Sequence, residues 1–181
     1  MAKLFFHYSA MNAGKSTLLL QVAHNYEERG LHPFLLKPSI DNRDDQNSIN
    51  SRIKLSKECV TCTVDENLLD TITQSHHKQA IDCVLIDEAQ FLSAEQVWQL
   101  AAVVDDLGIP VMTYGLRTDF QGRLFPGSAE LMAIADELRE IRTVDESGKK
   151  ATMVVRLDED GEVVQDGPQN LVGDNDIYKS V

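Results

Sequence analysis

A run of small residues between an apolar strand and an amphipathic helix carries the side chains best suited to chemistry. The run ends in Gly14-Lys15-Ser16-Thr17. Backbone N–H groups at a helix N-terminus, together with the helix dipole, favour a bound phosphate. A lysine there can reach phosphate oxygens, and a hydroxyl can bind Mg²⁺. The run therefore predicts a phosphate-binding loop (P-loop) made of Ser9, Ala10, Met11, Asn12, Ala13, Gly14, Lys15 and Ser16.

Ser9 stands where the usual P-loop pattern, G-x-x-x-x-G-K-[ST], has its first glycine. A helix cap rich in small residues is therefore an alternative for this run. The strand before it and the helix after it favour the P-loop, because that loop requires this context.

Two adjacent carboxylates follow a second apolar strand, Cys83-Val84-Leu85-Ile86. The carboxyl ends of parallel strands meet the loops at one edge of a sheet, where ligands bind. Asp87 at this place can hold Mg²⁺ together with Ser16, and Glu88 can then act as a base. Gln90 follows in the same turn, and we expect it to belong to the same nucleotide-phosphate (ATP) site as the P-loop. A helix cap is the alternative role for the Asp-Glu pair, and the nearby P-loop favours the catalytic one.

Short apolar strands and amphipathic helices alternate over residues 1–137. This alternation predicts an α/β fold, with a parallel P-loop sheet flanked by helices and joined by right-handed crossovers. Ser93 and Gln96 have capping-box spacing before one helix, which should end at Gly108. Residues 39–57 are polar and predict a long loop. Strands are expected near 4–8, 34–36, 59–63, 83–86 and 111–114, and helices near 15–29, 65–77, 94–107 and 127–135.

The pattern changes near residue 137. Residues 138–144, 152–157 and 162–164 are expected to be extended, with turn-forming segments between them. We therefore predict a P-loop nucleotide-binding α/β domain over 1–137 and a small C-terminal β appendage over 138–181.

The charge and the cysteines of the chain restrict its partners and location. Asp and Glu outnumber Lys and Arg by 29 to 17, which gives a formal net charge of −12. Nucleic-acid-coating proteins and polybasic membrane anchors depend on cationic surfaces, so neither nucleic acid nor a membrane is an expected partner. Three cysteines without a signal-peptide pattern predict a reducing, cytoplasmic location. Cys59 and Cys62 have C-x-x-C spacing in an expected strand, where structural thiols are favoured over metal or redox work.

Four segments together resemble the type II thymidine kinases, close to the bacterial branch. They are residues 8–17, the Arg52-Ile53 neighbourhood, Asp87-Glu88-Ala89-Gln90-Phe91 and residues 114–120. A P-loop alone is common to many families, whereas these four segments in this order are specific. The resemblance spans essentially the whole chain. It implies an enzyme of nucleoside salvage that transfers the γ-phosphoryl group of ATP to the 5′-hydroxyl of thymidine.

The resemblance also implies roles for individual residues. Glu88 matches the base that takes the proton from the 5′-hydroxyl, and Asp87 and Ser16 match the Mg²⁺ environment. Arg43 matches an arginine near the phosphates, with a solvated loop charge as the alternative. The thymidine site is matched by Met11, Leu116 and Phe120 at the base, and by a covering lasso made of Gln169, Asn170, Leu171, Val172, Gly173 and Tyr178. Plain core packing is the alternative for Met11, Leu116 and Phe120.

The sequence departs from the family pattern at two places. The family carries a structural zinc, and the turn that supplies two of its cysteines reads Val144-Asp145-Glu146-Ser147-Gly148 here. The other ligands would lie at or beyond Tyr178-Lys179-Ser180-Val181, so we expect no zinc. Asp174 stands where the lasso usually has a second glycine, and its side chain could alter the loop geometry.

A P-loop ATPase of the helicase or motor type is the alternative function, because Asp87-Glu88-Ala89-Gln90 resembles a helicase Walker B box. Such a motor needs a second lobe or a ring of subunits, and usually a basic track. A chain of 181 residues with a charge of −12 supplies neither the second lobe nor the track. The family resemblance instead implies a homotetramer that uses ATP and thymidine.

Overall fold

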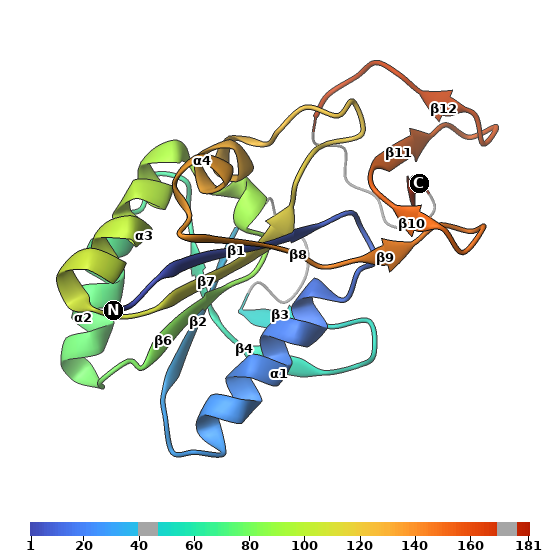
Figure 1. Cartoon of the computed structure of the whole chain (residues 1–181). Coiled ribbons are helices and arrows are strands. Elements are labelled where there is room, and N and C mark those ends of the chain that lie inside the picture. Colours follow the sequence, from blue (N-terminus) through green and yellow to red (C-terminus); the bar gives the residue numbers. More distant parts are fainter. Residues whose placement is uncertain (40–46, 170–176) are drawn as a thin grey trace.

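A parallel sheet forms the centre of the molecule. The computed structural model describes residues 1–39, 47–169 and 177–181. Within them, six strands lie in the order β5-β2-β6-β7-β1-β8, and each strand is parallel to its neighbours. These are β1 (Leu4–Ser9), β2 (Pro33–Pro38), β5 (Val60–Cys62), β6 (Cys83–Ile86), β7 (Val111–Leu116) and β8 (Glu137–Glu140). The predicted α/β fold with a parallel sheet is confirmed (Figure 1).

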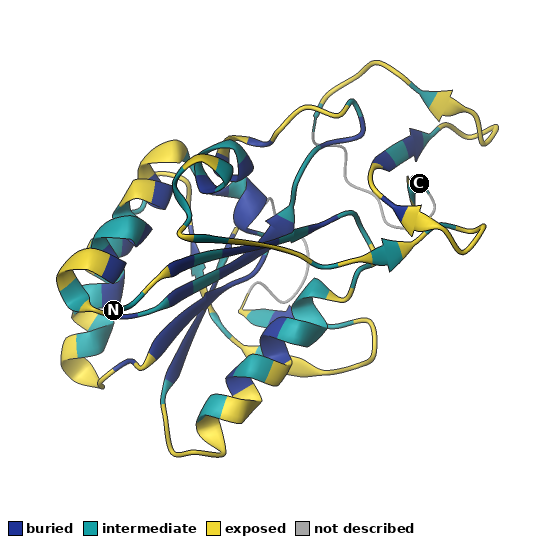
Figure 2. Ribbon diagram, in the orientation of Figure 1, coloured by how far each residue is buried: buried dark blue, intermediate teal, exposed yellow. Residues whose placement is uncertain are grey.

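Helices cover both faces of this sheet. Helix α1 (Lys15–Glu27) lies on one face, and α2 (Leu68–Lys78), α3 (Ala94–Leu107) and α4 (Pro126–Ile134) lie on the other (Figure 1). Side chains along β6 alternate between the two cores: Cys83 and Leu85 join the cluster under α1, whereas Val84 and Ile86 join the other. The strand is apolar throughout because both of its faces are buried. Figure 2 shows the buried strands between helices whose outer faces are exposed.

The capping box before α3 has the predicted geometry. The Ser93 hydroxyl accepts a hydrogen bond from the Gln96 backbone N–H at 3.2 Å, and Gln96 Oε1 accepts one from the Ser93 N–H at 3.1 Å. The helix ends at Leu107, and Gly108 follows in the left-handed conformation with φ 66°. Here local sequence chemistry alone sets both ends of the helix.

The prediction of a structureless loop over 39–57 is wrong in its second half. Strands β3 (Ser48–Asn50) and β4 (Ser56–Glu58) form an antiparallel hairpin. Ile49 is its one buried residue, and it packs with the cluster under α1. A hairpin with a single buried side chain has no apolar alternation, so sequence periodicity does not reveal it.

The strand just after the predicted domain boundary belongs to the central sheet. Residues 138–144 were expected in the appendage, yet Glu137–Glu140 form β8 and pair with β1. All of its side chains except that of Leu138 are charged, as suits an edge strand, and Lys3 Nζ pairs with Glu137 Oε1 at 2.7 Å. The sequence does not distinguish such a strand from a surface hairpin.

The remaining short strands lie after β8. They are β9 (Thr143–Val144), β10 (Lys150–Ala151), β11 (Val154–Leu157), β12 (Val163–Val164) and β13 (Tyr178–Ser180). Strands β9 and β10 pair as a hairpin, and β12, β11 and β13 form a three-stranded sheet. The division into two domains stays a prediction. In the described part of the chain, no helix is long and apolar enough to cross a bilayer.

Gly127 lets α4 begin directly against the short helical turn η1 (Ala89–Phe91) that follows β6. A Cβ atom at Gly127 would lie 2.4 Å from the Ala89 carbonyl oxygen and 2.9 Å from that of Leu92. Both neighbours are backbone atoms, which cannot rotate away as a side chain can. This contact fixes the turn that carries the paired carboxylates.

We expect Gly127→Ala to destabilise the protein by about 1–3 kcal/mol, because the added methyl group must push two segments of backbone apart. Thermal unfolding should then show a lower Tm, by roughly 2–4 °C for each kcal/mol. Ala133→Ser, on the exposed side of the same helix, is the control and should change stability by less than about 0.5 kcal/mol. Equal melting curves for the two variants would contradict the close contact.

Candidate active site

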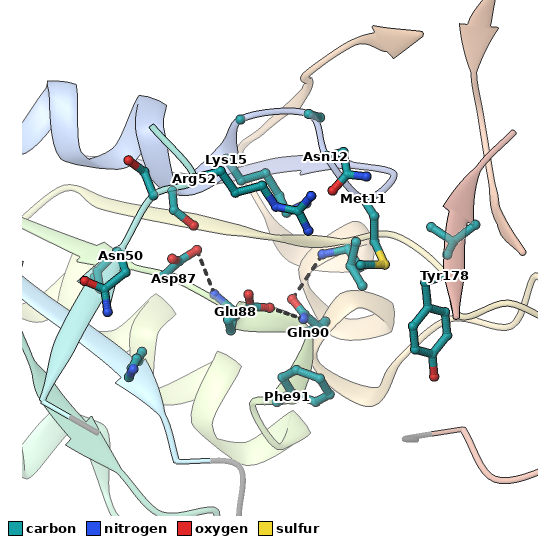
Figure 3. Close-up of a pocket in the computed structure, with 18 of the residues that line it drawn as sticks. Met11, Asn12, Lys15, Asn50, Arg52, Asp87, Glu88, Gln90, Phe91 and Tyr178 are labelled. Atoms are coloured by element: carbon teal, nitrogen blue, oxygen red, sulfur yellow. Dashed lines mark hydrogen bonds between the residues drawn. The ribbon is translucent and has the colours of Figure 1, made fainter. Parts of the chain in front are cut away.

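The P-loop runs from the end of β1 to the start of α1 at the carboxyl edge of the sheet (Figure 3). Gly14 and Asn12 both have left-handed backbones, with φ of 78° and 61°. A left-handed backbone is unusual for a residue other than glycine, and such strain gathers at functional sites. Left-handed residues beside right-handed ones also form backbone nests that bind anions. The loop geometry therefore suits a phosphate.

Lys15 folds back over this loop. Its Nζ donates hydrogen bonds to Ser9 Oγ at 3.1 Å and to the Ala10 carbonyl at 3.0 Å. Burial lowers the pKa of Lys15, and the carboxylates of Glu88 and Asp87 act in the opposite direction. Ser9, which replaces the first glycine of the usual pattern, thus provides an acceptor for the lysine.

Asp87 ends β6 beside the P-loop. Its side chain is buried, and it accepts hydrogen bonds from the Ser16 hydroxyl and, at 3.1 Å, from the Glu88 backbone N–H. Burial and then repulsion from Glu88 raise the pKa of Asp87 to about 6. A buried carboxylate of this kind is stabilised by a nearby cation. Ser16 and Asp87 also present the oxygen donors that Mg²⁺ prefers, so the residues present fit a magnesium ion.

Glu88 is directed by its neighbours. It has a left-handed backbone, with φ 52°, so its side chain diverges from that of Asp87. Gln90 Nε2 donates to Glu88 Oε2, while Gln90 Oε1 accepts from the Leu116 backbone N–H at 3.0 Å (Figure 3). Gly115 leaves room for this arrangement, since a Cβ there would lie 2.8 Å from Gln90 Oε1. The Gln90 amide therefore ties Glu88 to the end of β7.

The other side of the site is apolar and aromatic. The cavity has a volume of about 680 Å³, within the range of roughly 300–1,000 Å³ that small-molecule sites occupy. The rings of Phe91 and Phe125 meet edge to face, with centroids 5.6 Å apart. Met11 and Tyr178 face this space from the P-loop and from β13 (Figure 3). A polar end and an apolar end thus share one cavity.

Most of the residues predicted for the site line this cavity. They are Met11, Asn12, Ala13, Gly14, Lys15, Ser16, Asp87, Glu88, Gln90, Leu116, Phe120, Gln169 and Tyr178. Ser9 and Ala10 are not among the described lining residues and instead contact Lys15. Arg43, Asn170, Leu171, Val172, Gly173 and Asp174 lie outside the described residues.

The structure adds lining residues that the sequence did not predict. Phe91, Phe125 and Val154 extend the apolar wall, and Lys37 and Arg52 bring positive charge to the polar end. Arg52 lies in the turn of the β3–β4 hairpin, and its charge lowers the pKa of Lys15. The sequence offered one signal for Arg52, its place in a family-like segment, but the hairpin that positions it was predicted as loop.

The turn between β9 and β10 is organised by a carboxylate. Asp145 Oδ1 accepts from the Ser147 N–H at 2.8 Å, the Ser147 hydroxyl at 2.7 Å and the Lys149 N–H at 3.0 Å. The Ser147 hydrogen bond holds the pKa of Asp145 below its usual range. In the described residues, no group of three His, Cys, Asp or Glu side chains could hold a metal. The residues present at this turn therefore do not fit the zinc that the resemblance implies.

Comparison with known proteins decides the family. The family model described as thymidine kinase matches residues 2–181. The chain belongs to the thymidine kinase family. A thymidine kinase of Rhizobium meliloti is 56% identical over 99% of this chain and 93% of its own length. A thymidine kinase of Jannaschia sp. is 54% identical over 100% and 93%, and one of Ruegeria pomeroyi is 52% identical over 100% and 91%.

Family membership identifies the chain as a nucleoside kinase, a phosphotransferase. The two ends of the cavity agree with such chemistry. Phosphoryl transfer depends on positioning and charge neutralisation, which suits the cations and the P-loop. The apolar wall suits the flat ring of a nucleobase.

Lys15→Ala is expected to lower turnover by roughly 10²-fold or more, because a cation aimed at developing phosphate charge is lost. The fold should survive, since Lys15 faces the cavity rather than the core. The measurement is the steady-state rate together with a melting curve. Lys150→Ala, which removes an exposed lysine paired with Glu140, is the control and should keep full activity. Near-normal turnover of a well-folded Lys15→Ala variant would rule out this role.

Proposed function

We propose that the protein catalyses transfer of the γ-phosphoryl group of ATP to the 5′-hydroxyl of thymidine, giving thymidine monophosphate. The observation that carries this proposal is that one cavity has a P-loop and paired carboxylates at one end and an aromatic wall at the other. The whole-chain match to the thymidine kinase family supports it and disfavours the helicase or motor alternative.

The polar end would hold the phosphates of ATP. Lys15 and Arg52 line this end and bring the positive charge that the phosphates need. Ser16 and Asp87 would hold Mg²⁺, which when bound would neutralise charge on the phosphate oxygens. Arg43 is proposed to act near the phosphates on the family resemblance alone.

Glu88 is proposed as the general base. Gln90 fixes one carboxylate oxygen of Glu88, which leaves the other oxygen to accept the proton of the 5′-hydroxyl. Such a base contributes typically 10²–10⁴-fold to a rate. The left-handed backbone of Glu88 supports this role, because it separates the base from the proposed magnesium ligand.

The apolar end would hold thymidine. Phe120 is proposed to stack on the base, and Met11 and Leu116 would contact the thymine methyl group, because all three line the cavity. Gln169 and Tyr178, which also line it, flank the segment proposed to close over the nucleoside. Closure would exclude water, which otherwise competes as phosphate acceptor.

Three further properties are part of the proposal. A homotetramer follows from the family resemblance. A cytoplasmic location is supported by the thiols, since all three cysteines of the chain are free. ATP and thymidine are the proposed partners, without nucleic acid or membrane, which agrees with the net charge of −12.

The test of the function is a panel of nucleosides with ATP and Mg²⁺, followed for monophosphate product. Thymidine should give product, and the other nucleosides should be slower. Stimulation of ATP hydrolysis by a polynucleotide, without any nucleoside product, would favour the motor instead.

Two matched variants separate the roles of the carboxylates. Glu88→Gln keeps size and hydrogen bonding but cannot accept a proton, so turnover should fall by roughly 10²-fold or more while both substrates still bind. Asp87→Asn should instead raise the Mg²⁺ concentration that half-maximal activity requires, because a metal-associated carboxylate is lost. Turnover, nucleoside affinity and Mg²⁺ dependence are measured for both variants.

The reverse pattern would show that these two roles are exchanged. That pattern is normal turnover for Glu88→Gln together with an inactive Asp87→Asn whose Mg²⁺ requirement is unchanged.

We predict that the purified protein carries no stoichiometric zinc, because Asp145 and Ser147 stand where the family has thiols. Metal analysis after dialysis should give far less than one zinc per chain, and a zinc chelator should leave the melting curve unchanged. A content of about one zinc per chain that survives dialysis would refute this.

A further inference from the structure

Arg156 is a buried arginine whose charge the proposed chemistry does not use. It lies in β11 and is only 5% exposed. Its guanidinium donates to the Pro168 carbonyl at 3.0 Å and to the Asp166 carbonyl at 3.0 Å. Among the described residues, no carboxylate lies within ion-pair distance of it. Burying a cation without a carboxylate partner costs free energy, so the other groups that contact this guanidinium must stabilise it.

The third partner of Arg156 is the ring of Phe120. The guanidinium carbon lies 3.9 Å from the ring centroid, closer than in the other two arginine–aromatic pairs among the described residues, at 4.8 and 5.9 Å. Phe120 lines the cavity, whereas Arg156 does not. The ring therefore lies between the guanidinium and the space proposed for the nucleobase, and a cation on an aromatic face is favourable when both are desolvated.

The carbonyls that Arg156 binds belong to the segment that leads into the proposed lasso. This stem, residues 165–169, is tied to the loop that carries Phe120 by two more hydrogen bonds. Gln169 Nε2 donates to Asp119 Oδ2 at 2.9 Å, and Gln121 Nε2 donates to the Gln165 carbonyl at 2.9 Å. Arg156 thus contacts both the ring and the stem carbonyls.

Gly167 fits closely around this guanidinium. A Cβ at Gly167 would lie 2.2 Å from Arg156 Nη2, and the residue has φ 140°. The stem therefore approaches the arginine as closely as a backbone without a side chain allows.

We propose that Arg156 is a positioning residue for the nucleoside, which holds the Phe120 ring and the lasso stem in register so that the base is bound between them. The proposal rests on thymidine occupying the apolar end of the cavity. Tyr178 pairs directly with Arg156 in the neighbouring strand, and cross-strand partners share a face of the sheet. Arg156 therefore contacts the residues before the lasso, at Pro168, and pairs with the residue after it, Tyr178.

Positioning both the ring and the stem requires a side chain with several N–H donors and a flat face. Arginine can bind two carbonyls and stack on a ring at the same time, because its guanidinium is flat and carries five N–H groups. Lysine has a compact charge and cannot do both. An apolar side chain of similar size would fill the same space but would leave the Asp166 and Pro168 carbonyls without these donors.

The test is a comparison of Arg156→Lys and Arg156→Met with the wild type, in steady-state kinetics with each substrate varied in turn. We expect the KM for thymidine to rise about tenfold or more in both variants, the order expected for a lost charge-assisted hydrogen bond or ring contact. The KM for ATP should change by less than about twofold, since the phosphate end is untouched. Melting curves are recorded for every variant.

Arg139 offers a matched control. It also stacks on a phenylalanine, Phe5, but at the edge strand β8 away from the cavity. Arg139→Lys and Arg139→Met should leave both KM values unchanged.

Gly167→Ala tests the same idea without altering the arginine, in case the Arg156 variants fold poorly. Its methyl group would displace the guanidinium, so the KM for thymidine should again rise selectively. Gly161→Ala is its control, because Gly161 also has a positive φ, of 81°, but nothing lies within 4 Å of a Cβ there. Gly161→Ala should leave both KM values unchanged.

Phe120→Leu separates failure of the inference from failure of the proposed site. If Phe120→Leu raises the KM for thymidine but Gly167→Ala and any folded Arg156 variant do not, Arg156 has no positioning role. A lower Tm and a lower apparent turnover, with both KM values unchanged, would show that Arg156 serves stability alone. A normal KM for thymidine in Phe120→Leu would instead overturn the proposed base site.

Discussion

The meeting of a lysine cation with two carboxylates at the carboxyl edge of the sheet is the interaction on which the site depends. Strands β1 and β6 flank β7 and are parallel to it, so the loops that follow them open at the same edge. Lys15 and Asp87 are each shifted away from their usual pKa by burial, and each lies in the field of the other. Unlike charges placed together in this way lower the cost of burying either one.

Fixed neighbours keep these charges in place. The turn after β6 is held from one side by α4, which approaches closely because residue 127 is glycine. From the other side, the Gln90 amide connects Glu88 with the backbone of Leu116. A site built on strand ends and packed turns is more precisely positioned than one built on free loops.

The short C-terminal strands contribute to both ends of the cavity. The Ser180 hydroxyl of β13 donates to the Met11 carbonyl at 2.7 Å, and the Thr143 hydroxyl donates to the Asn12 carbonyl at 3.3 Å. The first bond ties the P-loop to β13, which carries Tyr178 and pairs with β11, the strand of Arg156, and the second ties it to β9. At the β9–β10 turn, the Asp145 carboxylate gathers hydrogen-bond donors around one oxygen. A carboxylate can thus organise this turn locally without a metal.

The sequence by itself determined the α/β fold, the P-loop, the paired carboxylates and the ends of α3, because each depends on local chemistry: apolar runs, a glycine before a lysine, or a capping box. Tertiary structure decided what local patterns do not encode. The β3–β4 hairpin that brings Arg52 to the cavity buries only Ile49, and β8 is an edge strand with mostly charged side chains. Phe91 and Phe125 look like ordinary core residues until the turn η1 and the start of α4 place them together. The contact of Arg156 with Phe120 joins residues 36 positions apart, and only the packed chain brings that cation and that ring together.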